Sequence, residues 1–193
     1  MRLIRYINEE SISKKLLQDF YNQVDNIRKE CQPYFKKVKG SSHLLIRYGG
    51  KENEKNDILK KKVRINRRPK DTSIVFHKMA DDFFLKKFGW RARSNVLFCM
   101  GEDRERIHEI SYFTLIFPVG NFKYVWSPDV ADLYTFDPDN EDYDGDWDDV
   151  KDTYIDKDFN KALKTQYEIM INCKEYYAIP PIFLYNMIEE FNL

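Results

Sequence analysis

The sequence is poor in the features that assign a protein quickly. Its three cysteines form no C-x-x-C pair, and its seven glycines form no phosphate-binding loop or dinucleotide fingerprint. Thirty-two basic residues balance thirty-two acidic ones, so the whole chain has no net charge to attract nucleic acid or a membrane. No apolar run approaches the roughly 20 residues of a membrane span, and the first residues lack the apolar stretch of a secretory signal. We therefore expect a cytoplasmic protein with no membrane partner, no metal site, and reduced, buried thiols.

Helical periodicity marks two segments of the first half. Apolar residues recur at steps of three and four from Leu16 to Cys31, with Ser11 or Ser13 as the cap and Pro33 just beyond the end. A second helix is expected within residues 71–89, capped near Asp71 or Thr72 and ended by Gly89.

Short runs rich in β-branched and aromatic residues fill most of the remainder. After an early strand in "SSHLLIRYGG", the expected strands are "NVLFCM", "YFTLIFPV", "KYVWS", "YEIMI" and "EYYAI". At 193 residues, with no internal repeat or linker, the chain is long enough for one core. These features predict a single α+β domain over residues 1–193.

Charge is sorted along the chain. Residues 51–70 carry nine basic and three acidic side chains, whereas residues 137–149 carry eight acidic and no basic ones. Both segments are predicted to be surface loops, and the acidic one to be mobile and to influence partner choice. The acidic segment is not an EF-hand, because the twelfth position counted from Asn140 is Lys151 where a glutamate is needed.

Arg47 is the first candidate for binding an anion. It lies near the end of the apolar run "LLIRYGG", where Gly49 and Gly50 leave the backbone open to a ligand. The planar guanidinium fork binds phosphate with two hydrogen bonds, so this position suits a pyrophosphate. An ion pair between Arg47 and a surface carboxylate is the alternative.

The run "VRINRRPKDT" offers further cations. Arg64, Arg67, Arg68 and Lys70 either add to an anion site or are simply solvated. A nucleic-acid partner is also open, with Tyr48 and Trp90 as stacking groups, although aromatic and basic residues are not interleaved here.

The run "WRARSNVLFCMG" places Arg93 and Ser94 at the entrance of a strand. No histidine and acid lie beside Ser94 in the sequence, so we do not expect a nucleophilic serine. The three histidines, His43, His77 and His108, are predicted to be structural or exposed.

Gln166 and Glu168 lie two residues apart before the apolar triplet "IMI". In a strand, this spacing directs an amide and a carboxylate to one face, as an active-site edge requires. Polar residues on the solvent side of an ordinary strand give the same pattern.

In chain order, Arg47, Ser94 and the Gln166-x-Glu168 pair resemble the Arg, Ser, Glu series of mono-ADP-ribosyltransferases. "TQYEIMINCKEYYAI" resembles the late strand pair of that family, and "LLIRYGG" its first strand. The chain length and the closing "EEFNL" resemble the small transferases of T-even phages. Where the family has an aromatic residue before Ser-Thr-Ser, this chain has "RSN", and Arg64 rivals Arg47 as the family arginine.

The resemblance implies N-terminal helices packed on a mixed, mostly antiparallel β-sheet sandwich. It implies NAD as substrate, held by Arg47 or Arg64 with Ser94. Glu168 would stabilise the cationic ribose, and Gln166 would orient the nucleophile of a macromolecular acceptor, with protein expected. It also implies a phage protein acting in the host cytoplasm. The alternative is a non-catalytic binding or inhibitory protein on the same scaffold, since a fold does not fix a function.

Overall fold

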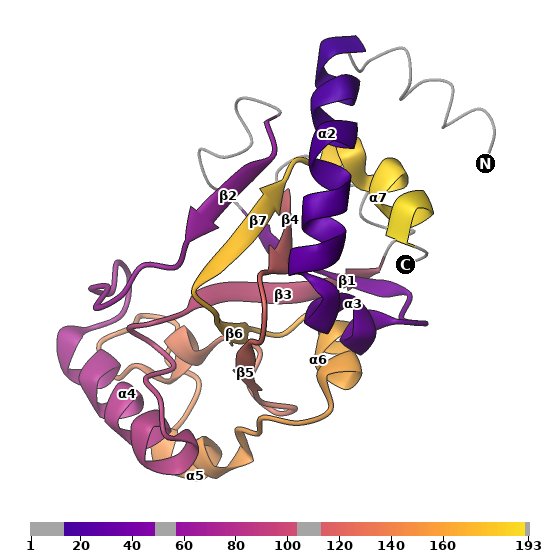
Figure 1. Cartoon of the computed structure of the whole chain (residues 1–193). Helices are drawn as coiled ribbons and strands as arrows, with labels where there is room; N and C mark the ends of the chain where they lie inside the picture. The colour runs from indigo at the N-terminus through magenta and orange to yellow at the C-terminus, as the bar shows by residue number, and fades with distance from the viewer. Residues whose placement is uncertain (1–13, 49–56, 104–112, 192–193) are drawn as a thin grey trace.

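The computed structural model of the chain describes residues 14–48, 57–103 and 113–191. These residues form six α-helices and one open, seven-stranded, all-antiparallel sheet (Figure 1). The helices are α2 (Lys14–Glu30), α3 (Gln32–Val38), α4 (Ile74–Phe88), α5 (Trp147–Val150), α6 (Phe159–Thr165) and α7 (Leu184–Phe191). The strands are β1 (His43–Tyr48), β2 (Leu59–Lys62), β3 (Leu97–Asp103), β4 (Phe113–Pro118), β5 (Lys123–Trp126), β6 (Ile169–Asn172) and β7 (Glu175–Ile179).

Strand β3 joins the two halves of the sheet, whose strand order is β2-β7-β4-β1-β3-β6-β5. Its first three residues pair with β6, and its last four pair with β1. Gly101 lies in the second part, where α6 crosses the strand closely. A Cβ atom at Gly101 would lie 1.9 Å from the carbonyl oxygen of Leu163, so only glycine fits beneath this helix.

Two clusters of buried side chains cover the sheet. The larger one contains side chains of α2, α3, α6 and α7, and the smaller one contains side chains of α4 and α5. In β6, Ile169 and Ile171 belong to the larger cluster, whereas Met170 belongs to the smaller one. The triplet "IMI" is therefore apolar throughout because both of its faces are buried. Within the described residues, no helix is long and apolar enough to cross a membrane.

Most predicted elements are confirmed. The helix ending before Pro33, the helix ending at Gly89 and all six predicted strands are present. Ser73, rather than Asp71 or Thr72, caps α4 by accepting a hydrogen bond from the Phe76 amide. All three cysteines are buried and free, as expected. The predicted caps Ser11 and Ser13 and the strand end at residues 49–50 lie outside the described residues.

Three predictions about the fold hold only in part. The sheet is neither mixed nor a sandwich, because every pairing is antiparallel and β3 connects all strands into one sheet. The basic segment is not all loop, because Leu59–Lys62 form β2 and pair with β7. Cross-strand hydrogen bonds hold this strand although its sequence, "LKKK", has only one apolar residue.

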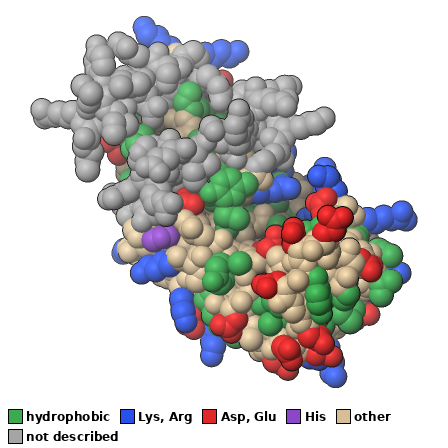
Figure 2. All heavy atoms as spheres, turned by 180° about the vertical axis from the view of Figure 1, so that it is seen from behind, with side chains coloured by type: hydrophobic (Ala, Val, Ile, Leu, Met, Phe, Trp, Pro, Cys, Tyr) green, Lys and Arg blue, Asp and Glu red, His purple; other side chains and the backbone are tan. Residues whose placement is uncertain are grey.

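The acidic segment is also not a free loop. Asp137 is buried and accepts hydrogen bonds from the backbone amide of Ser73 at 2.5 Å and from its hydroxyl at 3.0 Å. Trp147 begins α5 and packs in the smaller core cluster. The other acidic side chains of the segment remain exposed, and carboxylates gather over the lower half of the molecule when it is seen from behind (Figure 2). Deleting residues 137–149 would therefore remove core contacts.

Candidate functional site

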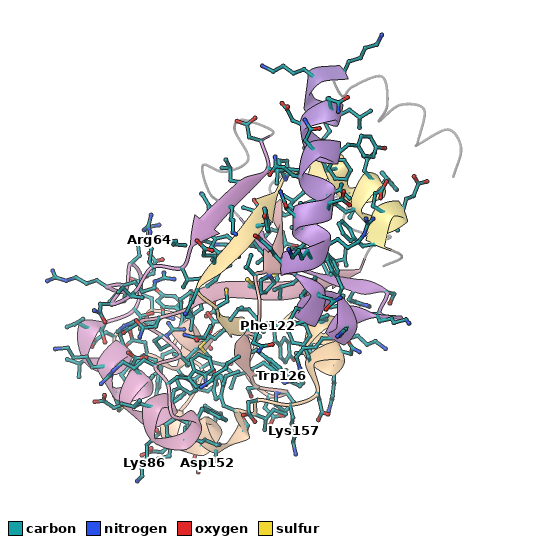
Figure 3. All side chains as sticks on the ribbon, viewed as in Figure 1. Arg64, Lys86, Phe122, Trp126, Asp152 and Lys157 are labelled. Atoms are coloured by element: carbon teal, nitrogen blue, oxygen red, sulfur yellow. The ribbon has the colours of Figure 1, made fainter. Side chains whose placement is uncertain are left out.

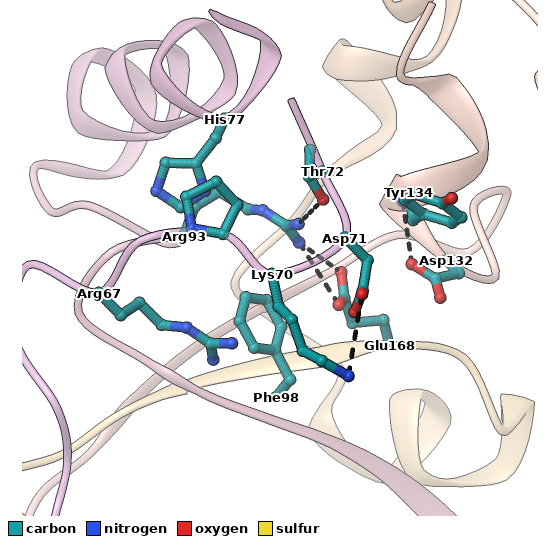
Figure 4. A pocket seen from close by; sticks show the side chains of 11 residues that line it. Arg67, Lys70, Asp71, Thr72, His77, Arg93, Phe98, Asp132, Tyr134 and Glu168 are labelled. Atoms are coloured by element: carbon teal, nitrogen blue, oxygen red, sulfur yellow. Dashed lines mark hydrogen bonds and ion pairs between the residues drawn. The ribbon is translucent and has the colours of Figure 1, made fainter. Parts of the chain in front are cut away.

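Glu168 lines a cavity of about 380 Å³ between the start of α4, the first residues of β3 and the segment 132–134 (Figure 4). Its backbone amide donates to the carbonyl of Ala131 at 2.8 Å, which fixes the residue just before β6. The side chain is only 17% exposed. We call this space the Glu168 cavity.

Arg93 holds the carboxylate. Its Nη1 lies 3.1 Å and 3.4 Å from the two oxygens of Glu168, and its Nη2 donates to the hydroxyl of Thr72 at 3.3 Å. Burial raises the pKa of Glu168 to about 7, although the Arg93 charge acts in the opposite direction. A carboxyl group with this pKa changes its charge near neutral pH, as acid–base groups at active sites commonly do.

Asp81 of α4 fixes the backbone that carries Arg93. This carboxylate is 1% exposed and accepts hydrogen bonds from the amides of Arg93 at 2.8 Å and Ser94 at 3.2 Å. It also accepts a short hydrogen bond from the Ser94 hydroxyl. Asp81 therefore sets the turn from which the Arg93 side chain reaches Glu168.

His77 lies one helical turn before Asp81 and also contacts Ser94, with Nε2 and Oγ 3.1 Å apart. Although no histidine and acid adjoin Ser94 in the sequence, α4 brings both to it in the fold. The three groups do not form a catalytic triad, since the acid contacts the serine and not the histidine. Burial lowers the pKa of His77, so this ring is neutral near pH 7.

Two buried polar atoms at the Glu168 cavity lack a hydrogen-bond partner in the described part of the chain. They are Nδ1 of His77 and Nε of Arg93, whose residues are 4% and 5% exposed. Unsatisfied buried polar atoms are uncommon in native proteins, and their presence beside a cavity is typical of a site that a ligand or water completes.

A second cavity of about 790 Å³ adjoins the first and shares Arg67 and Lys70 with it. We call it the cationic groove. Its charged lining residues are Arg47, Lys62, Arg64, Arg67, Arg68 and Lys70, and its other lining residues are Val63 and Ile65. Arg64 projects outward from the segment that follows β2 (Figure 3).

Arg67 forms the junction between the two cavities. Its amide donates to the Ser94 carbonyl at 3.1 Å, and its guanidinium carbon lies 4.5 Å from the centre of the Phe98 ring. The guanidinium carbon of Arg93 lies 4.7 Å from the same ring centre. Burial and the neighbouring charges of Arg93, Arg47 and Arg64 lower the pKa of Arg67. Cations therefore crowd the junction and favour an anion there.

The structure brings some of the predicted site residues together. Arg47 and Arg64 both line the cationic groove, next to the Glu168 cavity. Ser94 lies outside the lining of both cavities and acts on the site through Asp81, His77 and the Arg67 amide.

The side chain of Gln166 does not lie beside that of Glu168 in the cavity. It occupies the left-handed position after α6, with φ of 59°, so the strand geometry that would direct both side chains to one face is absent. Its side-chain nitrogen donates to Glu102 at 2.8 Å, and Gln166 lines neither cavity. Trp90 likewise cannot serve as a stacking group, because it is 8% exposed within the smaller core cluster.

Several contributors were not predicted as site residues. Arg93, Asp81, His77 and Phe98 build the site described above, beside Arg67, which the sequence had offered as a cation of an anion site. The spacing of His77 and Asp81, four residues apart on a predicted helix that ends beside "RARS", was the available signal. In the residues that the structure describes, no group of three or more His, Cys, Asp or Glu side chains is arranged to hold a metal ion.

Comparison with protein-family models, curated proteins and solved structures gave no match to this chain. The functional conclusion therefore depends on the geometry of the two cavities and on the sequence pattern.

Proposed function

We propose that this protein is an NAD-dependent mono-ADP-ribosyltransferase that modifies a macromolecular acceptor. The observation that carries the proposal is the position of Glu168. This largely buried carboxylate lies in a cavity that adjoins a cationic groove, and Arg67 and Lys70 belong to both cavities.

The two cavities match the two charges of the reaction. NAD has an anionic pyrophosphate, and its nicotinamide ribose becomes cationic when the glycosidic bond breaks. Arg67 and Arg47 would hold the pyrophosphate, with Arg64 as the rival of Arg47, because guanidinium forks bind phosphate oxygens in pairs. Glu168 would then lie on the side of the ribose, where a preorganised negative charge stabilises the developing cation.

The step transfers ADP-ribose from one nitrogen to an acceptor atom. The bond between ribose C1′ and the nicotinamide nitrogen breaks, and its electron pair leaves with nicotinamide. A lone pair of the acceptor forms the new bond to C1′, and the acceptor loses a proton to solvent. Arg93 would keep the Glu168 carboxylate oriented towards the reacting ribose, since it contacts both oxygens.

Labelled NAD tests the proposal directly. The purified protein is incubated with NAD labelled in the adenylate moiety, with and without a cell lysate, and both nicotinamide release and label on macromolecules are measured. We expect release and acceptor labelling that require the protein. Tight NAD binding by calorimetry without any nicotinamide release would contradict the transferase proposal.

The Arg93–Glu168 ion pair favours a second candidate function. A carboxylate that is already neutralised by an arginine stabilises a cation less well than a free one. A non-catalytic binding or inhibitory protein could use the same cavities for a nucleotide ligand. The release assay separates the two functions, because only the transferase frees nicotinamide.

A further inference from the structure

The cationic groove carries more positive charge than NAD requires. Among the described residues that line it, six of eight are lysine or arginine, and none is acidic. A pyrophosphate carries about two negative charges, so it would match two of the six cations. The match to a pyrophosphate rests on the proposed function. With any dinucleotide that has one pyrophosphate, four of the six cations would still have no phosphate partner.

Most of these cations have no carboxylate partner within the described part of the chain. In the described ranges, no carboxylate forms an ion pair with Arg47, Lys62, Arg64, Arg67 or Arg68, and Lys70 has only a 3.9 Å contact with the exposed Asp71. Elsewhere in the molecule, the exposed Lys60 and the half-buried Lys151 do have carboxylate partners. The local charge of the groove thus contrasts with a chain whose net charge is zero.

The chemistry of the groove favours phosphates over carboxylates of an acidic protein. Four of the six cations are arginines, whose forks suit phosphate oxygens. Five of the six cations follow one another along a nine-residue segment, from Lys62 at the end of the edge strand β2 to Lys70, as the repeated charges of a phosphodiester chain do. The sixth, Arg47, belongs to β1. Ile65 lies among them and is 74% exposed, which offers an apolar contact to a base or sugar.

We propose that the cationic groove binds the phosphodiester backbone of a single-stranded nucleic acid. Bound there, the strand would pass the junction at Arg67 and present its bases or ribose groups to the Glu168 cavity. If the transferase proposal also holds, the nucleic acid is then placed as the acceptor.

A binding titration without NAD tests the groove independently of turnover. The probe is a fluorescent single-stranded oligonucleotide of about 15 nucleotides, followed by anisotropy at several salt concentrations. We expect the logarithm of the affinity to fall linearly with the logarithm of salt. The Lys62→Ala/Arg68→Ala variant should bind at least about tenfold more weakly, and its salt slope should be smaller by about 1.4, since each lost phosphate contact removes about 0.7.

The Lys161→Ala/Lys164→Ala variant is the matched control, because it removes two exposed charges from α6, outside both cavities. Its affinity and slope should equal those of the wild type. Circular dichroism and thermal melting establish that both variants are folded, as expected for exposed side chains that form no ion pair with another described residue.

Three outcomes would overturn the inference. The first is oligonucleotide affinity that is equal in the Lys62→Ala/Arg68→Ala variant and the wild type. The second is binding of poly-glutamate as tight as that of the oligonucleotide, which would indicate an acidic protein partner. The third is oligonucleotide binding no tighter than that of pyrophosphate alone, which would indicate a small-anion site. None of these results bears on nicotinamide release, so the transferase proposal stands or fails separately.

Discussion

The two adjoining cavities of this protein treat charge in opposite ways. At the Glu168 cavity the most buried charged groups are paired, with Arg93 bound to Glu168 and, behind them, Asp81 bound to the backbone that carries Arg93. In the cationic groove, Lys62, Arg64 and Arg68 are exposed and have no carboxylate partner among the described residues. Pairing is compulsory where charges are desolvated, because an isolated buried charge costs several kcal/mol. It is optional in water, where a ligand can supply the opposite charge.

The strongest test of the paired cavity is removal of Arg93. Arg93→Met keeps much of the side-chain volume but leaves the Glu168 carboxylate without its partner. We expect the free energy of unfolding to fall by about 3 kcal/mol in urea titrations at about pH 8. Arg68→Met, the control in the open groove, should stay within about 0.5 kcal/mol of the wild type. If both variants lowered the free energy of unfolding equally, the paired charges of the Glu168 cavity would stabilise the fold no more than the unpaired charges of the groove.

Glu168→Gln separates chemistry from binding. The amide keeps the size of the side chain but lacks the negative charge that the ribose cation needs. Nicotinamide release should therefore fall by about a hundredfold or more, while NAD affinity measured by calorimetry changes little. Release that continues at the wild-type rate would exclude Glu168 as the catalytic carboxylate.

Arg47→Ala should have a smaller effect, and on a different quantity. Loss of one phosphate contact weakens NAD binding by about tenfold, because the contact exists in the ground state as well as in the transition state. Calorimetry measures this change. Arg64→Ala in parallel decides between the two rival arginines, and unchanged affinity in both variants would place the pyrophosphate elsewhere.

The pH profile of turnover should show the smallest change. The pKa of Glu168 is raised to about 7, and the reaction needs the ionised carboxylate, so activity is lost as pH falls through this value. We expect nicotinamide release at about pH 6.5 to be roughly fourfold slower than at about pH 8, from the ionised fractions alone. A rate independent of pH over this interval would mean that Glu168 does not titrate there.

Much of the fold follows from local sequence patterns. The apolar spacing and Gly89 define α4, and the β-branched runs define the strands near their observed positions, because these elements bury a regular set of side chains. Strand β2 escaped prediction, since "LKKK" has no apolar alternation and depends on its pairing with β7. The acidic segment was misjudged because Asp137 and Trp147 are held by distant partners, Ser73 at the cap of α4 and Phe76 within it.

The site was predictable only in part. Glu168 and Arg47 stand out in the sequence because each lies beside an apolar strand, and the structure places them in adjoining cavities. Gln166 was expected beside Glu168, but the end of α6 turns the chain at that residue before the strand begins. The sequence does not show that Arg93 is the partner of Glu168, because the two residues are 75 positions apart and meet only in the folded chain.

The close crossing of α6 over Gly101 has a consequence for how this protein can vary during evolution. Gly101 lines neither cavity, yet any larger residue would push against the Leu163 backbone and displace α6. That helix leads directly into the turn before Glu168. Homologous chains that keep the carboxylate in place should therefore also keep glycine at this position, and a glycine in a β-strand would help to identify distant relatives whose surface residues have diverged.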